Sequence, residues 1–135
     1  PVEHRLELKK YGQINIIDDA YNSNPVGSKM AVEVLGMMPG KRIIVTPGMI
    51  ELGIEQYGFN NEFGHVIADH ADIVILIGKD QTKPIYDGLK EEKFKEKNIY
   101  VLNDVKEAFP LVTKLSEGHE TYVLLENDLP DIFNE

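Results

Sequence analysis

Short runs of β-branched residues alternate along the chain with longer segments in which apolar residues recur at helical spacing. The runs at 42–46 and 72–78 are apolar almost throughout, which is typical of strands buried on both faces of a parallel sheet. We expect strands at 5–8, 13–18, 42–46, 72–78, 99–102 and 121–125, and helices at 25–38, 57–71, 81–94 and 104–117. This alternation predicts one α/β domain with a mostly parallel sheet of about six strands and helices on both faces. The first short strand is the one that can pair antiparallel at an edge.

Local signals indicate several helix ends. Asn24 is a good N-cap, and Pro25 suits the first turn of a helix, where its missing N–H needs no partner. The third helix is expected to be interrupted near Pro84 and Gly88, and Pro110 is expected to start a turn or bend the last helix. The apolar residues of the first helix that are predicted to face the core are Val26, Met30, Val34, Leu35 and Met38.

The composition narrows the class of function. A chain of 135 residues is long enough for one domain with a sizeable core. The formal net charge of −9 argues against non-specific nucleic-acid binding, which relies on clustered Lys and Arg. The sequence has no cysteine, which fits a cytoplasmic protein, and no apolar run approaches the roughly 20 residues of a membrane helix. The first residue is Pro1 rather than methionine, so we expect a fragment of a longer multidomain protein.

Polar side chains gather where the second predicted strand ends and the first helix begins. The segment 14–25 starts as an apolar strand and then carries Asp18, Asp19, Tyr21, Asn22, Ser23 and Asn24. Ligands of open α/β sheets bind at the carboxyl ends of the strands. So many groups able to form hydrogen bonds exceed what a connecting turn needs, and we expect this segment to form the floor of a binding site.

Two other interpretations of the same segment stay open. Asp18 and Asp19 could bind Mg²⁺, as in phospho-acceptor receiver domains, which would make the chain a signalling or binding module of flavodoxin or receiver type. Those domains also need a third Asp at the end of the central strand, and here that strand ends at Thr46. Alternatively, the Asp and Asn side chains only cap a turn by bonding to nearby backbone. For Asn24 alone we favour that explanation.

No other motif supplies a complete catalytic site. The segment 36–41 superficially suggests a phosphate loop, but it has three residues rather than four between its glycines and runs from a helix into a strand. A triphosphate, if used, is therefore held by another domain. His65 and His70 are five residues apart and fall on different helix faces, so we expect no metal site there. Glu51 lies in a Gly-rich loop after the third strand, where it is either solvated or placed to receive a substrate ammonium group.

Three segments together resemble the C-terminal domain of the Mur ligases. They are Val2-Glu-His-Arg-Leu-Glu7, Asp18-Asp-Ala-Tyr-Asn-Ser-Asn-Pro25 and Gly48-Met-Ile-Glu-Leu-Gly53, of which the second is the specific one. The similarity covers most of the chain and is greatest to the MurF type, which adds D-alanyl-D-alanine in peptidoglycan synthesis. It implies a Rossmann-like, three-layer αβα domain of a cytoplasmic ATP-dependent ligase that acts on a UDP-MurNAc-peptide through an acyl phosphate.

The resemblance also implies how the work is divided between domains. The central ATPase domain of the same enzyme would hold ATP and Mg²⁺, and the C-terminal domain would close over ATP and bring the incoming D-amino acid or dipeptide. The fragment alone is then expected to be inactive, with no catalytic residue or metal ligand of its own. The residues expected on the nucleotide side are Arg5, Asp19 and Asn22. Those expected on the side of the incoming amine are Tyr21, Asn24 and Glu51.

Two departures from the MurF pattern leave the added amine open. The usual Gly-Asp-Met loop reads Pro47-Gly48-Met49 here, so an acidic side chain is missing. The late Lys-Gly-Ser-Arg segment of many MurF-type chains is replaced by the stretch 125–131. We interpret Glu126 as the start of an acidic tail.

Overall fold

The computed structural model describes residues 6–19 and 24–127 of the chain. The strands are β1 (Glu7–Tyr11), β2 (Ile14–Asp19), β3 (Lys41–Thr46), β4 (Ile73–Ile77), β5 (Ile99–Leu102) and β6 (Thr121–Glu126). The helices are α1 (Pro25–Gly36), α2 (Gln56–Ala68), α3 (Lys83–Glu91) and α4 (Ala108–Leu115), with short 3-10 helices η1 (Gly53–Glu55), η2 (Glu96–Asn98) and η3 (Val105–Glu107). None of the described helices is long and apolar enough to cross a lipid bilayer.

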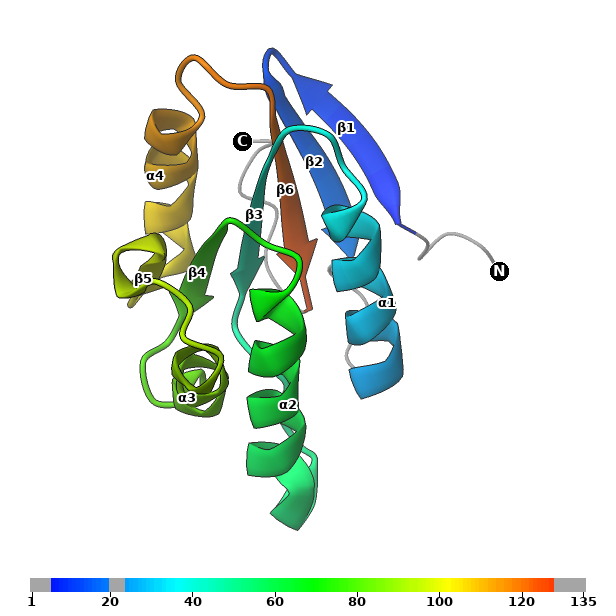
Figure 1. The fold of residues 1–135 in the computed structure, drawn as a ribbon, viewed down its shortest axis with the longest axis vertical. Coiled ribbons are helices and arrows are strands. Elements are labelled where there is room, and N and C mark those ends of the chain that lie inside the picture. Colours follow the sequence, from blue (N-terminus) through cyan, green and yellow to red (C-terminus); the bar gives the residue numbers. More distant parts are fainter. Residues whose placement is uncertain (1–5, 20–23, 128–135) are drawn as a thin grey trace.

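The strands form one sheet in the order β1-β2-β6-β3-β4-β5 (Figure 1). β1 pairs antiparallel with β2, and the other neighbouring pairs of described strands are parallel. The predicted mostly parallel sheet with an antiparallel edge strand is therefore confirmed. The last strand, β6, lies between β2 and β3, so strands from both ends of the chain meet in the middle of the sheet.

Helices cover both faces of the sheet, but unequally. α1, α2 and α3 pack on the face that carries Ile44 and Leu124, whereas α4 packs on the face that carries Ile43 and Val123. The direction in which the chain crosses the sheet explains this division. From β2 to β5 the chain moves toward one edge, and from β5 to β6 it returns, so a right-handed crossover places α4 on the opposite face.

The core stripe predicted for α1 is wrong at two positions. Val26 and Met30 are 71% and 60% exposed. The buried residues of α1 are Ser28, Ala31, Val32 and Leu35. Both sets recur at helical spacing, so periodicity alone does not choose between the two faces. Ser28 belongs to the buried face because its hydroxyl group is hydrogen-bonded to a buried carboxyl group of β6, a contact that a pattern of apolar residues does not register.

The third and fourth helices also differ from the prediction. α3 is uninterrupted, because Pro84 lies at its start. Gly88 lies where α3 crosses α2, and a Cβ atom there would collide with the carbonyl oxygen of Asn61. The helix predicted from residue 104 is divided into η3 and α4, and Pro110 occupies the first turn of α4, where a missing N–H loses no helical hydrogen bond.

Candidate functional site

The carboxyl ends of β2, β6 and β3 lie side by side in the middle of the sheet (Figure 1). The connections from β2 to α1 and from β3 to α2 both leave from this edge, and β6 ends between them. The chain also reverses its crossing direction here, since β6 is reached by the return crossover. Crevices at such reversals are where open α/β sheets bind ligands. We therefore take this part of the sheet, called the carboxyl edge below, as the candidate site.

Each of these three strands ends in a polar residue, and the three residues lie side by side across the sheet. Asp19 is paired in register with Glu126, and Val45 is paired with Leu125, so Thr46 lies beside Glu126. Residues in register on parallel strands point to the same side of the sheet. Asp19 is 5% exposed, and Glu126 and Thr46 are 0% exposed. We call Asp19, Glu126 and Thr46 the polar row.

Glu126 is the centre of the polar row. The Thr46 hydroxyl group donates a 2.6 Å hydrogen bond to its Oε1 atom, and the Ser28 hydroxyl group, on α1, donates to its Oε2 atom. Burial raises the pKa of Glu126 from 4.5 to about 7, because the charged form loses its hydration. The two hydroxyl donors oppose this rise in pKa, and the carboxylate of Asp19 adds to it. The carboxyl group is therefore an acid that exchanges its proton near neutral pH.

The loop after β3 is anchored to its own strand and to α2. The Gly48 N–H group donates to Thr46 Oγ1 at 3.0 Å. The Met49 N–H group donates to Asn60 Oδ1 at 2.9 Å, and Asn60 Nδ2 donates to the Met49 carbonyl oxygen at 2.9 Å. Gly48 has φ of 81°, which glycine adopts without strain, and a Cβ atom there would make a tight contact at 3.2 Å from Asn60 Oδ1. The loop is thus held in one place at the edge of the site.

Asn127, directly after β6, joins this loop to the end of β2. Its N–H group donates to the Asp19 carbonyl oxygen at 3.2 Å, and its Nδ2 atom donates to the Gly48 carbonyl oxygen. Its φ of 69° lies in the left-handed region, which Asn tolerates better than most residues. The side chain is 3% exposed, and its Oδ1 atom has no hydrogen-bond donor within the described ranges. Asn127 therefore links the end of β2 to the loop after β3 by hydrogen bonds.

Three of the six predicted site residues lie in the described part of the chain. Asp19 belongs to the polar row. The Asn24 side chain caps α1 by accepting a 2.8 Å hydrogen bond from the Gly27 N–H group, as favoured for this residue taken alone. Glu51 is exposed on the loop after β3 and has φ of 63°. The remaining three lie outside the described residues: Arg5, Tyr21 and Asn22.

Sequence reasoning missed Glu126 and Asn127. The interpretation of Glu126 as the start of an acidic tail is wrong, because Glu126 is the last residue of β6 and is fully buried. β6 lies between β2 and β3, and α1 contributes Ser28 to the same point. A positional signal was available, since a polar residue directly follows the apolar run of each strand that ends at the carboxyl edge.

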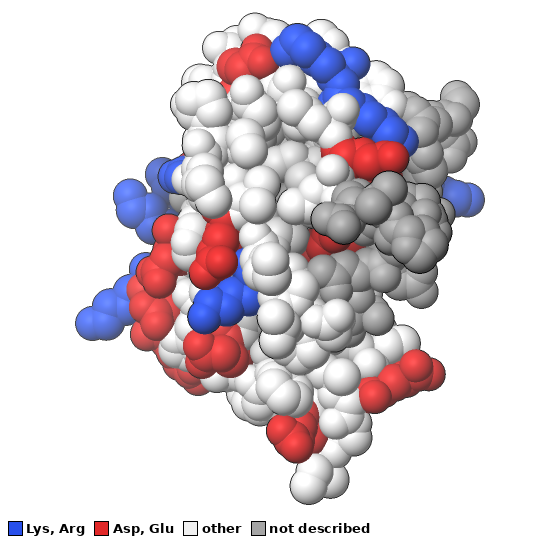
Figure 2. All heavy atoms as spheres, turned by 90° about the vertical axis from the view of Figure 1, so that its right-hand side faces the viewer, with Lys and Arg blue, Asp and Glu red and all other residues white. Residues whose placement is uncertain are grey.

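Away from the carboxyl edge, a group of titratable side chains joins α2 to the end of α3. His65 on α2 contacts Glu92 at 2.5 Å and Glu91 at 2.8 Å, and these two hydrogen bonds raise the pKa of His65. Among residues 6–19 and 24–127, no group of three or more His, Cys, Asp or Glu side chains is arranged to hold a metal ion. In Figure 2 the charged side chains seen at the lower end, where α2 begins in Figure 1, are acidic.

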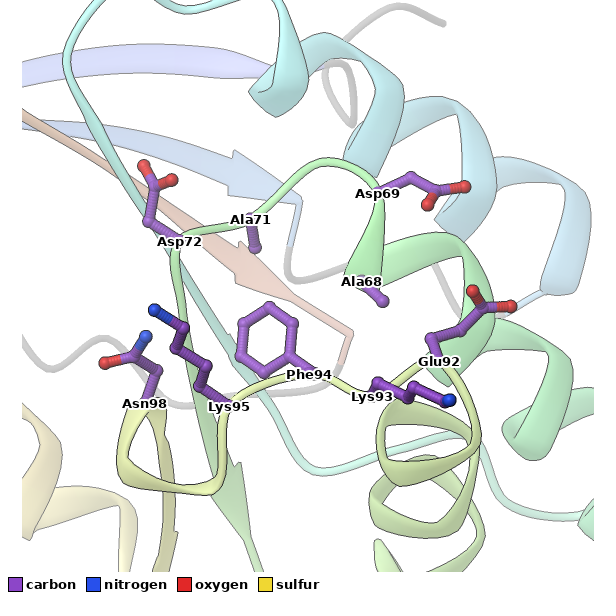
Figure 3. Close-up of a pocket in the computed structure, with 9 residues that line it drawn as sticks. All are labelled: Ala68, Asp69, Ala71, Asp72, Glu92, Lys93, Phe94, Lys95 and Asn98. Carbon is purple, nitrogen blue, oxygen red and sulfur yellow. The ribbon is translucent and has the colours of Figure 1, made fainter.

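Two hollows complete the description. An open one of about 380 Å³ lies beyond the amino end of β4, where Phe94 points into its middle between Lys95 and Ala71 (Figure 3). It lies at the end of the sheet opposite to the polar row. A smaller hollow of about 200 Å³ lies between α1 and α2. Its lining is mostly apolar: Pro25, Val26, Lys29, Met49, Phe59, Glu62, Phe63 and Val66.

Residues 4–125 of the chain match the family described as Mur ligase, glutamate ligase domain. Among the curated proteins that are similar in sequence, those of Bacillus subtilis and Escherichia coli are both named UDP-N-acetylmuramoyl-tripeptide–D-alanyl-D-alanine ligase. The Bacillus subtilis protein is 39% identical over 79 residues, which are 56% of this chain and 17% of that protein. The Escherichia coli protein is 38% identical over 65 residues, which are 47% of this chain and 14% of that protein. The chain thus spans less than a fifth of the length of these relatives.

Solved structures of MurF proteins share the fold. MurF from Acinetobacter baumannii superimposes with a TM-score of 0.74 at 21% identity, over 93% of this chain and 26% of that chain. The MurF ligase from Thermotoga maritima, solved in complex with ADP, superimposes with a TM-score of 0.72 at 24% identity, over 94% of this chain and 28% of that chain. These likenesses confirm the predicted three-layer α/β architecture.

Proposed function

Because the chain belongs to the Mur ligase glutamate ligase domain family, we propose that it serves as the C-terminal domain of an ATP-dependent amide-bond ligase of peptidoglycan precursor synthesis. One observation carries the proposal. Asp19, from the specific motif at 18–25, lies in the polar row, at the edge of the sheet where α/β domains bind ligands. This placement of Asp19 supports the proposal, because ligands of α/β domains bind at that edge.

In the proposed reaction ATP supplies the phosphoryl group that turns a substrate carboxylate into an acyl phosphate, from which an amine displaces phosphate to form an amide. The contribution of this chain is to orient the reactants and exclude water when it closes over them. A loop that is held in place at the carboxyl edge suits that task. Asn60 and Asn127 hold the loop after β3 through hydrogen bonds to Met49 and Gly48.

The proposed contacts divide the predicted site residues between the two ligands. The residues assigned to the nucleotide side are Arg5, Asp19 and Asn22. The residues assigned to the incoming amine are Tyr21, Asn24 and Glu51. Glu51 suits this role because its carboxylate is exposed and can pair with an ammonium group.

The described part of the carboxyl edge fits a ribose or an amine better than a triphosphate. Its polar groups are the carboxyl groups of Asp19 and Glu126, the Thr46 hydroxyl group and the Asn127 amide. A ribose hydroxyl or an ammonium group can donate to a carboxylate such as that of Asp19, whereas negative phosphate oxygens are repelled by it. We therefore assign the triphosphate and Mg²⁺ to the central domain of the same enzyme, so the 135-residue chain alone should neither bind ATP tightly nor hydrolyse it.

We propose D-alanyl-D-alanine as the amine and a UDP-MurNAc-peptide as the substrate that it joins. Two curated relatives carry this activity in their names. The reaction would take place in the cytoplasm, and the absence of cysteine from the chain suits such a reducing compartment. The altered loop Pro47-Gly48-Met49 makes the amine the part of the proposal to test first.

The test uses the chain joined to the rest of its natural protein. We expect release of phosphate from ATP that depends on both UDP-MurNAc-tripeptide and D-alanyl-D-alanine. Asp19→Ala should lower kcat/KM by about tenfold or more, since a charge-assisted contact to the nucleotide is lost. Asp69→Ala, at an exposed aspartate near the opposite end of the sheet, is the matched control. Turnover that is independent of any amine would contradict the ligase assignment. Full activity after combining Asp19→Ala with Arg5→Ala would contradict the site assignment.

A further inference from the structure

We propose that Glu126 is a positioning residue of the carboxyl edge, and that it holds Asp19 and the loop after β3 in place as an uncharged acid. The proposal rests on the ligase function only for its effect on activity. The contacts of Glu126, described next, stand independently of that function.

Glu126 joins three elements that are far apart in sequence. Its Oε1 atom accepts from Thr46 at the end of β3, across 80 positions of sequence. Its Oε2 atom is hydrogen-bonded to the Ser28 hydroxyl group on α1, across 98 positions. In the uncharged acid, one of these two hydroxyl oxygens accepts the carboxyl proton. Its neighbour in register on the other side is Asp19 at the end of β2. The carboxyl group thus connects β3 with α1, and the backbone pairing of β6 with β2 places Asp19 beside it.

The connection continues into the loop after β3. The Thr46 oxygen that donates to Glu126 also accepts a 3.0 Å hydrogen bond from the Gly48 N–H group. Next to Glu126 in the chain, Asn127 bonds to the carbonyl oxygens of Asp19 and Gly48. A displacement of the Glu126 carboxyl group would therefore be transmitted to Gly48 through two routes.

The protonation state of Glu126 determines whether its place beside Asp19 is electrostatically unfavourable. Among the described residues, the groups that act on its carboxyl are the hydroxyl groups of Ser28 and Thr46 and the carboxylate of Asp19. Loss of the proton would place two negative charges side by side in a buried row, which is unfavourable at low dielectric. Because the pKa of Glu126 is about 7, the row changes from one charge to two close to neutral pH.

A glutamate is an unusual choice for a purely structural position of this kind. Glu126 is 0% exposed. Burial of a carboxyl group costs more free energy of hydration than burial of an apolar or amide side chain of similar size. The polar row therefore gains a property that glutamine could not provide, namely a proton that can leave.

The test compares wild type with Glu126→Gln in the natural protein that contains this chain. Glutamine keeps the shape of the protonated acid and, like it, has one carbonyl oxygen that accepts and one group that donates, but it cannot ionise. We expect the wild-type KM for ATP to rise by about fivefold as pH increases through about 7, and the KM of Glu126→Gln to stay constant over the same range. Glu117→Gln, at an exposed glutamate after α4, should keep the wild-type profile. Identical pH profiles for wild type and Glu126→Gln would overturn the proposal.

A second measurement separates this inference from the proposed function. In the 135-residue chain, the amide NMR signals of Asp19, Gly48 and Asn127 should titrate with one midpoint near pH 7, and should not titrate in Glu126→Gln. Thr46→Val removes a donor that favours the charged form, so its midpoint should move to higher pH even if Glu126→Gln folds poorly. Absence of this titration in wild type would refute the role of Glu126. Titration without any ligase activity would refute only the proposed function.

Discussion

The hydroxyl group of Thr46 donates a 2.6 Å hydrogen bond to the carboxyl group of Glu126, although 80 positions separate the two residues in the sequence. The bond exists because β6, the last strand, pairs with β3 in the middle of the sheet. It places a titratable group inside the carboxyl edge, directly beside Asp19. The stability of the domain should therefore respond to pH through Glu126.

The first prediction concerns the free energy of unfolding. The pKa of Glu126 is raised in the folded state from 4.5 to about 7, so its protonated form stabilises the fold at low pH. This contribution is complete below about pH 4.5 and is lost as pH rises through about 7. Between these limits wild type should lose roughly 3 kcal/mol relative to Glu126→Gln. Urea unfolding of both proteins at a series of pH values measures the difference, and a difference that does not change with pH would contradict the prediction.

The second prediction concerns the pair formed by His65 with Glu92 and Glu91. These hydrogen bonds raise the pKa of His65, so the pair stabilises the packing of α2 against α3 below pH 6.5. The contribution should disappear as pH rises through the raised pKa. His65→Gln should lower Tm in acid but not in alkaline buffer, and His119→Gln, at an exposed histidine, should leave Tm unchanged at both. Equal effects of His65→Gln at both pH values would disprove the pairing.

The third prediction concerns two glycines of neighbouring helices. A Cβ atom at Gly88 would collide with the carbonyl oxygen of Asn61, so Gly88→Ala should destabilise the protein by about 2 kcal/mol or more. Gly58, in α2, has open space around it. Gly58→Ala should stabilise the protein by roughly 0.5–1 kcal/mol, because alanine favours the helix. Chemical denaturation compares the two, and a neutral Gly88→Ala would argue against the close approach of α3 to α2.

The fourth prediction separates two roles of Asn24. Its side chain caps α1, so Asn24→Ala should destabilise the domain by about 1 kcal/mol, whereas Asn24→Ser should keep the cap and the stability. If Asn24 also contacts the incoming amine, Asn24→Ser should raise the KM for D-alanyl-D-alanine in the natural protein. An unchanged KM with unchanged stability would restrict Asn24 to capping.

The amino-acid sequence alone was enough to predict most of the architecture. The apolar runs at 42–46 and 72–78 are long enough and uniform enough to indicate buried parallel strands, and Asn24 with Pro25 marks the start of α1 within one residue. Alternation of strands and helices then leads to a mostly parallel sheet, and the polar segment after β2 leads to its carboxyl edge. The inferences about the architecture succeed because they depend on periodicity and on local hydrogen bonding, which are properties of contiguous residues.

The tertiary structure decided what depends on residues that are distant in sequence. No local pattern reveals that β6 lies between β2 and β3, and that position alone turns Glu126 from the presumed start of a tail into a buried acid beside Asp19. The same contact turns Ser28 toward the core and leaves Val26 and Met30 exposed, although both faces of α1 have helical spacing. The order of strands in a sheet is a non-local property, because it results from the packing of the whole domain. The sequence therefore led to a predicted site at the carboxyl edge, and the packing of β6 decided which further side chains lie there.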